Sequence, residues 1–510
     1  MISASLNELY DLIKSLGKSE KRFFKLTVTG EPNSQGIAAL FDVLEKLHEE
    51  ELAKPNKQIS KLIKQHNLID ETYNTILKSQ RTFYAESISA YRQKDEISNL
   101  RNLFDKAQYK QCRKMLNKLK EELIKVESFN FLLEILSIEK DLIDIENKFG
   151  VTFTPLENLI KEEQLLISKS KNIGEFAQAF SKLNYMVRQS MVAKTDKELD
   201  AYTKLLTSPL FKNKDKCFSK KAEVLYYHTR ALCFSKKRDN KNRMVEFSDM
   251  VALMDKNQFL IDEYPKRYLS AINNILSVEI NDLHYLTAEK LIDKFILLKK
   301  HPAFNTTDLQ LKIFTSTTNA QLLIYTDGGR TNKAIPVAKY INEQIAIYKD
   351  KINKEELLIF YYNFTNLYIY SDNFKEAGKY LDLLLNENDK HLRQDLQCFS
   401  RIQNIILNYE LNKIPQLKYM LKIAGDLYKI QKPQFKAENL VLAMFEELIE
   451  TNDKELIWKK YRTLFNELFN DSFEIIANYY FDFQAYVESK IHNRKIGELI
   501  FEKQANNWKK

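Results

Sequence analysis

The side chains best suited to metal binding, acid–base work or nucleophilic attack are scattered along this sequence. None of the seven histidines belongs to an HExxH motif, and no two cysteines form a CxxC pair. The chain also lacks the GxxxxGK phosphate loop, the GxGxxG fingerprint and the GxSxG elbow. Adjacent carboxylates such as Glu355 and Glu356 fall on predicted helices with lysines nearby, where solvation explains them. We therefore expect a protein that is not an enzyme and that has no catalytic residues, metal site or cofactor.

The cysteines and the N-terminus indicate a compartment. The four cysteines are Cys112, Cys217, Cys233 and Cys398. Because they are far apart, reduced thiols in the cytoplasm explain them best. The first amphipathic run carries Glu8 and Asp11, so it does not resemble a signal peptide, and no apolar run approaches the ~18 residues of a membrane span. The sequence predicts a soluble cytoplasmic protein without membrane insertion.

The composition favours helices. Among 510 residues there are only 10 glycines and 9 prolines, so turns are scarce and the elements between them are long. Hydrophobic residues make up 44% of the chain, which is ample for a continuous core. The net charge of +9 arises from 78 basic and 69 acidic residues interspersed along most of the chain, a pattern typical of solvated helix faces. We predict an all-α fold.

Residues 57–125 contain two features that point toward nucleic acid. Residues 57–85 resemble the helix-turn-helix of DNA-binding proteins, with a helix ending near His66 and a longer one beginning around Asp70. Between Arg92 and Lys125, ten basic residues face five acidic ones. Under this hypothesis the contacting side chains are Thr72, Asn74, Thr75, Lys78, Arg113 and Lys114. The alternative is an ordinary helical hairpin that caps the rest of the chain.

The C-terminal half contains a repeating pattern. Predicted second helices of two-helix units begin near Tyr285, Asn332, Phe374 and Ile414. Each carries a small or apolar residue two or three positions later, and these residues are 46, 43 and 40 positions apart: Ala288, Ala334, Ala377 and Leu417. A period between about 20 and 50 residues is the signature of stacked repeats.

The segment Asn363–Leu385 resembles a tetratricopeptide repeat. Tyr368 matches the motif's tyrosine in the first helix, and Phe374 matches its aromatic residue after the turn. Ala377 matches its small residue, and Leu381 and Leu384 match its later packing positions. Two departures are evident, because the spacing exceeds the usual ~34 residues and because Asp372 and Asn412 replace the turn glycine that Gly329 retains.

The resemblance implies an architecture. We expect a right-handed α-solenoid of stacked helical hairpins over residues 96–450, in which each hairpin buries the apolar face of the next. Residues 1–95 would form a small N-terminal helical segment. Residues 451–510 would form capping helices, with the aromatic cluster Tyr479, Tyr480, Phe481 and Phe483 packed inside the cap or exposed as a docking surface.

The resemblance also implies a binding groove on the inner faces of the first helices. The positions that line the groove in that family correspond here to Asn273, Ser277, Asn319, Leu323, Tyr362, Asn366, Tyr370 and Tyr409. Asparagine amides can pair with an extended peptide backbone, and tyrosines supply contact area with a hydroxyl group. Alternatively, the tyrosines belong to the core.

Two functions follow from these patterns. The first is a non-enzymatic interaction or scaffold protein, a monomer or homodimer, that binds a protein or peptide in the groove of the repeat array. The alternative is a regulator that combines an N-terminal nucleic-acid-binding segment with a peptide-sensing repeat domain, a plan that bacterial peptide-sensing regulators resemble. A factor that associates with RNA or the ribosome is a related version of this alternative.

Overall fold

A computed structural model describes residues 5–48, 57–62, 67–85, 89–146, 153–189, 196–348, 351–389, 392–430, 435–471 and 473–505. Every regular element in these ranges is an α-helix or a short 3-10 helix. The all-α prediction is therefore confirmed for the described residues.

The chain divides into two compact units. Unit 1 comprises Met1–Glu175 with Cys217–Ala222, and unit 2 comprises Phe176–Lys216 with Glu223–Lys510. The long helix α10 (Thr154–Gln189) contributes residues to both, and so does α12, whose first three residues belong to unit 1. The division into residues 1–95, 96–450 and 451–510 stays a prediction.

Unit 1 contains two apolar cores, one built by α1 to α6 and the other by α7 to α10. Its other elements are α1 (Leu6–Ser15), α2 (Lys18–Thr27), η1 (Val28–Gly30), α3 (Ser34–Lys46), α5 (Lys57–Leu62), α6 (Leu68–Tyr84), α7 (Ser89–Asp105), α8 (Tyr109–Lys125) and α9 (Phe129–Glu146). The second helix of the predicted helix-turn-helix thus begins at Leu68, preceded by Asn67 in a left-handed conformation with φ 66°. The predicted helix end near His66 lies outside the described residues.

Unit 2 contains the region with the repeating pattern. Its elements after α10 are α11 (Asp196–Thr207), η2 (Lys214–Lys216), α12 (Lys220–Lys236), α13 (Asn240–Asp255), α14 (Gln258–Glu263), α15 (Pro265–Asn281), α16 (Tyr285–Leu297), η3 (Leu298–Lys300), η4 (Pro302–Phe304), α17 (Thr307–Asp327), α18 (Thr331–Tyr348), α19 (Lys354–Tyr370), α20 (Phe374–Leu385), α21 (Gln394–Glu410), α22 (Ile414–Ile430), α23 (Lys436–Glu450), α24 (Lys454–Leu468), α25 (Ile475–Tyr480), α26 (Phe483–His492) and α27 (Ile496–Gln504).

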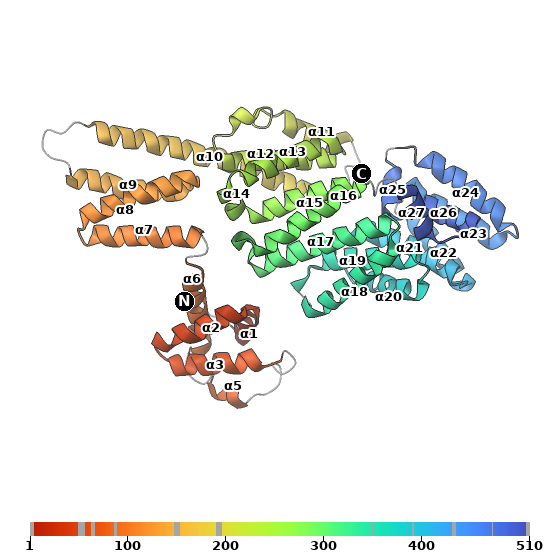
Figure 1. Ribbon diagram of the computed structural model, residues 1–510, viewed down its shortest axis with the longest axis horizontal. Helices are drawn as coiled ribbons and strands as arrows, with labels where there is room; N and C mark the ends of the chain where they lie inside the picture. Colours follow the sequence, from red (N-terminus) through yellow and green to blue (C-terminus); the bar gives the residue numbers. More distant parts are fainter. Residues whose placement is uncertain are drawn as a thin grey trace. The chain divides into compact units, whose positions relative to one another are not determined.

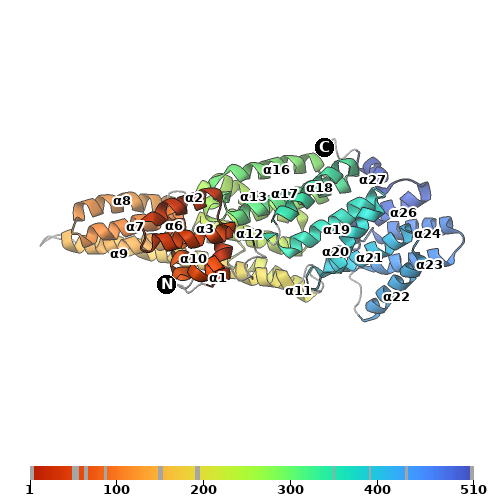
Figure 2. The ribbon, with the colours of Figure 1, turned by 90° about the horizontal axis from the view of Figure 1, so that it is seen from below.

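Helices α15 to α23 pack in a regular order. Each of α15, α17, α19 and α21 contacts the helix that follows it and also the next of these four or α23. Figure 1 and Figure 2 both show α17 and α19 side by side. The four residues predicted to permit close helix packing, Ala288, Ala334, Ala377 and Leu417, are fully buried. We refer to α15, α17, α19 and α21 as the first helices.

The same turn joins the two helices of four successive pairs. Its left-handed residue is Leu283, Gly329, Asp372 or Asn412, with φ between 53° and 70°. The next N–H then donates to the carbonyl five residues earlier, from His284 to Glu279, Arg330 to Tyr325, Asn373 to Tyr368 and Lys413 to Asn408, at 2.7–2.8 Å. This is the Schellman arrangement that ends helices. Aspartate and asparagine can take the place of the turn glycine because they tolerate left-handed backbone.

Local chemistry also fixes where α19 begins. The side chain of Asn353 accepts a hydrogen bond from the Glu355 N–H at 2.9 Å. Glu355 and Glu356 lie in the first turn, where carboxylates interact favourably with the positive end of the helix dipole. The adjacent carboxylates noted in the sequence therefore lie at a helix start.

Helix α27 packs tightly against the turn between α17 and α18. A Cβ atom added to Gly329 would lie 2.2 Å from the backbone nitrogen of Phe501 and 2.5 Å from the Gly497 carbonyl oxygen. A Cβ atom on Gly497 would in turn lie 2.8 Å from Thr331. The absence of a side chain at Gly329 therefore permits both the left-handed backbone of the turn and the close approach of α27.

We predict that Gly329→Ala destabilises the protein by about 2–6 kcal/mol, since left-handed strain and overpacking add. Urea unfolding followed by circular dichroism measures the change. The matched control is Gly425→Ala inside α22, where an added Cβ has no neighbour within 4 Å. That substitution should leave stability unchanged or raise it by up to about 1 kcal/mol. Equal stability of the two variants would contradict the close approach of α27.

Candidate functional site

Five of the residues predicted to line the groove lie together on unit 2. Asn273 belongs to α15, Asn319 to α17, and Tyr362, Asn366 and Tyr370 to successive turns of α19. We call these five, with the side chains around them on the first helices, the first-helix face. The face has two parts, one open and one covered by the chain itself.

The open part is a hollow of about 110 Å³ between α15, α17 and α19. It is lined by Asn273, Lys312, Thr315, Ser316, Asn319, Glu356, Ile359 and Phe360. Lys312 and Glu356 form an ion pair of 2.6 Å across it, so their charges offset each other. The remaining polar lining consists of neutral amides and hydroxyls. This open hollow can donate and accept hydrogen bonds without favouring a charged ligand.

Amide side chains join the first helices to one another. Asn363 donates from Nδ2 to Oδ1 of Asn319 at 2.8 Å, which joins α19 to α17. Gln403 donates from Nε2 to Oδ1 of Asn366 at 2.6 Å, which joins α21 to α19. The Asn366 side chain is buried and Gln403 is inaccessible to solvent. The bond from Gln403 fixes the orientation of the Asn366 amide, because a buried amide left unpaired is costly. Oε1 of Gln403 itself is buried without a hydrogen-bond partner among the described residues.

The covered part of the face binds the backbone of a distant segment. The Tyr362 hydroxyl donates to the Tyr480 carbonyl oxygen at 3.0 Å, and Asn366 Nδ2 donates to the same oxygen at 2.7 Å. One turn further along α19, the Tyr370 hydroxyl oxygen accepts from the Asp482 N–H at 2.8 Å. Side chains on one stripe of α19 thus bind both a carbonyl and an N–H of extended backbone around Phe481 (φ −153°, ψ 131°).

Helix α21 holds the side chain of the same segment. The ring of Tyr480 stacks on Phe399 with centroids 4.3 Å apart and planes 5° apart. Its hydroxyl donates to Asp395 Oδ2 at 3.1 Å, and Asp395 also forms an ion pair of 2.7 Å with Arg393. Burial opposes the ionised carboxylate, but the Arg393 guanidinium outweighs it and holds the pKa of Asp395 below its usual value. An ionised acceptor therefore faces the phenol.

Burial also sets the protonation of the tyrosines on α19. It raises the pKa of Tyr362 and of Tyr370 well above the usual range, so both hydroxyls stay protonated. Tyr362 can consequently donate to a carbonyl at any physiological pH.

Tyr409, which was also predicted to line the groove, lies elsewhere. Its ring packs against Phe445 at 5.2 Å and Trp458 at 5.8 Å, on the side of α21 that meets α23 and α24. The residues that α21 contributes to the first-helix face are Asp395, Phe399 and Gln403, which sequence reasoning missed. Their signal was weak, since the repeat spacing of 40–46 residues does not fix the helix register to within one turn.

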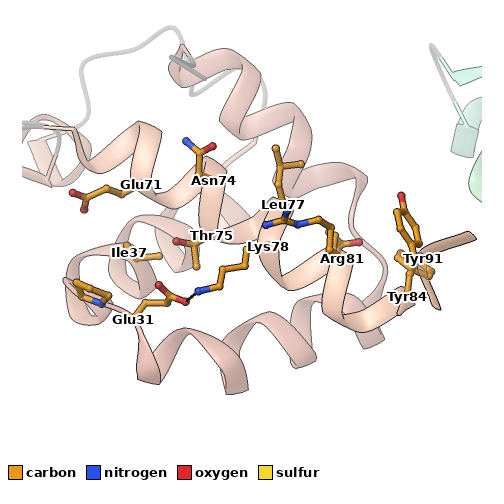
Figure 3. A pocket seen from close by; sticks show the side chains of 12 residues that line it. Glu31, Ile37, Glu71, Asn74, Thr75, Leu77, Lys78, Arg81, Tyr84 and Tyr91 are labelled. Atoms are coloured by element: carbon orange, nitrogen blue, oxygen red, sulfur yellow. Dashed lines mark hydrogen bonds and ion pairs between the residues drawn. The ribbon is translucent and has the colours of Figure 1, made fainter. Parts of the chain in front are cut away.

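The residues proposed to contact nucleic acid lie in unit 1. Asn74, Thr75, Lys78 and Arg81 of α6 line an open cavity of about 930 Å³ (Figure 3). Lys78 points toward Glu31 and forms an ion pair of 2.6 Å with it. Asn74 donates to the Asp70 carbonyl at 2.7 Å. Thr72 does not line this cavity, because it is fully buried and donates to the Leu68 carbonyl at 2.7 Å.

Two basic residues of α8, Arg113 and Lys120, form ion pairs with acidic side chains. Arg113 pairs with Glu139 at 3.4 Å and with Glu146 at 2.8 Å. Lys114 is exposed. Since the acidic residues of α9 balance part of the positive charge counted along residues 92–125, the local field on phosphate is weaker than the sequence suggests. Nucleic-acid binding stays a prediction.

The described residues also bear on metal binding and on membrane insertion. Within these residues, no group of three or more histidine, cysteine, aspartate or glutamate side chains is arranged to hold a metal ion. In the same part of the chain, no helix is both long and apolar enough to cross a membrane.

No protein-family model matches the sequence, and no curated protein matches it either. What can be inferred about function therefore rests on the geometry of the two units.

We predict that Tyr370→Phe lowers stability by about 1–2 kcal/mol, because the Asp482 N–H loses its acceptor. Backbone hydrogen exchange should show the Asp482 amide among those that exchange faster. The control is Tyr340→Phe on α18, whose side chain is 47% exposed and which should change stability by less than about 0.5 kcal/mol. Unchanged exchange at Asp482 would contradict the assigned hydrogen bond.

Asp327, at the end of α17, makes stability depend on pH. Burial and, after it, the nearby Asp482 carboxylate raise the pKa of Asp327 to about 7. The unfolded chain has an aspartate pKa of about 3.9, so between these values the folded protein binds the additional proton. The contribution of Asp327 to the free energy of unfolding is therefore greatest below pH about 3.9, and it is lost as the pH rises to about 7.

We predict that Asp327→Asn removes this loss, since the amide carries no charge at any pH. The variant should gain stability over the natural chain by about 1.4 kcal/mol per pH unit within that window. Urea midpoints at pH 5 and pH 8 measure the difference, and the exposed Asp382→Asn serves as the control. A difference between the variant and the natural chain that is the same at both pH values would contradict the assignment.

Proposed function

We propose that this protein is a non-enzymatic interaction protein whose first helices form the groove of a right-handed, tetratricopeptide-like solenoid. The groove holds an extended segment of a protein partner. The observation that carries the proposal is the hydrogen bonding of the Tyr480 carbonyl and the Asp482 N–H by three side chains of α19. A face that already binds extended backbone is suited to bind more of it.

The open hollow is the proposed place for the partner. Asn273 and the outward part of Asn319 offer amide groups, and Thr315 and Ser316 add hydroxyls. Because Lys312 and Glu356 offset each other, recognition there depends on backbone amides and short uncharged side chains. A hollow of about 110 Å³ fits a short side chain and excludes a folded element. The partner segment is therefore extended and locally uncharged.

The proposal includes the cytoplasm as the location and a monomer or homodimer as the assembly. The free thiols of Cys112 and Cys233, both fully buried, support a reducing compartment.

The test is affinity purification of the tagged full chain from its own host, comparing the natural sequence with Asn273→Arg. Arginine at this position fills the open hollow and adds an unpaired charge, so we predict at least about a tenfold loss of the retained partner. The control is Asn281→Arg, the same change at an exposed residue of the same helix, which should retain the partner. Equal recovery with both variants would contradict a partner site in the hollow.

A further inference from the structure

Residues 473–480, which we call the strap, lie between α24 and α26 and cover the first-helix face. We infer that the strap is an exchangeable occupant of a tyrosine-binding site on α19 and α21, and that a tyrosine-bearing extended segment of a partner protein is the competing occupant. This inference rests on the proposed function and names the chemistry of one of its ligands.

The site binds three features of Tyr480. Tyr362 and Asn366 bind the backbone carbonyl, Phe399 stacks on the ring, and Asp395 accepts from the hydroxyl. Tyr480 is the last residue of α25 and the backbone is extended at Phe481, so a segment of another chain with a tyrosine just before extended backbone could present the same carbonyl, ring and hydroxyl. The hydroxyl contact discriminates against phenylalanine, because the buried Asp395 carboxylate would lose a donor.

The strap can leave without unfolding its neighbours. Helices α24 and α26 pack directly on each other, with Phe465 and Phe483 at 5.6 Å and Trp458 and Tyr486 at 5.9 Å. Phe481 is buried beside Tyr370 at 5.4 Å, so it anchors the strap at its C-terminal end. The strap would therefore open about the Phe481–Asp482 position while both flanking helices stay in place.

The strap is held at its two ends and also between them, where Ala477 is inaccessible to solvent and the Asn478 side chain accepts from the Phe483 N–H at 3.0 Å. At its start, the Phe473 ring packs on Phe435 at 5.0 Å and under the Arg238 guanidinium at 4.5 Å. Tyr480 at its end is only half-buried, and the preceding Tyr479 is 60% exposed. Between them, α25 has only six residues, too few for a helix that is stable alone. A short, partly exposed segment of this kind opens more easily than the buried helices around it.

The probe is a fluorescent synthetic peptide with the sequence of residues 473–483, added to the full-length protein. Tyr480→Ala in the protein should vacate the part of the site that holds the ring and hydroxyl, and should tighten peptide binding at least about tenfold over the natural chain. Tyr479→Ala is the matched control, since it changes an exposed tyrosine one residue away and should bind like the natural chain. Replacing the tyrosine equivalent to Tyr480 by phenylalanine in the peptide should weaken binding several-fold.

Two results would overturn the inference. One is a folded Tyr480→Ala protein that binds the peptide no better than the Tyr479→Ala protein. The other is a hydrogen-exchange result for the natural chain, in which the strap amides exchange no faster than those of α26. This measurement keeps the inference testable if Tyr480→Ala fails to fold. Adding Asn273→Arg should leave peptide binding unchanged, so failure of the strap inference and failure of the open hollow are distinguishable.

Discussion

The amide of Asn366 must find hydrogen-bond partners once α19 is packed, and the covering of the first-helix face depends on this constraint. Asn366 is buried, and its amide is paired on one side with Gln403 and on the other with the Tyr480 carbonyl. Helix α19 is consequently tied to α21 and to the C-terminal segment by the same side chain. A hydrophobic residue at this position could fill the space but could not specify which segment covers the face.

The turns make this arrangement possible. Each of the four Schellman turns joins a first helix to its partner through three residues, so the first helices face one another in a constant order. At Gly329 the same turn also admits the backbone of α27. The C-terminal helices are thereby fixed beside the first-helix face, where Asp482 lies near enough to Asp327 to raise its pKa.

The sequence predicted the local features well and the distant pairings poorly. Scarce glycine and proline indicated helices, and the recurring small residues identified Ala288, Ala334 and Ala377 as buried packing positions. The resemblance to the tetratricopeptide repeat also implied that Tyr362, Asn366 and Tyr370 share one face of a first helix. Nothing periodic links Asn366 to Tyr480, which is 114 residues away, so the occupant of that stripe could not be predicted. Tyr409 was predicted to be the residue of α21 on the first-helix face. The residue of α21 that bonds Asn366 there is instead Gln403, which is 37 residues further along the chain.

We propose that the first-helix face holds an extended segment of a partner protein. Photo-crosslinking in the natural host is the most direct test of this proposal. A photoreactive residue would replace Asn273 in the open hollow or Asn281 at the exposed end of the same helix. The account predicts a discrete crosslinked partner from position 273, attached through a single segment of its chain, and none from position 281. Absence of an adduct at position 273, or the same adducts from both positions, would contradict it.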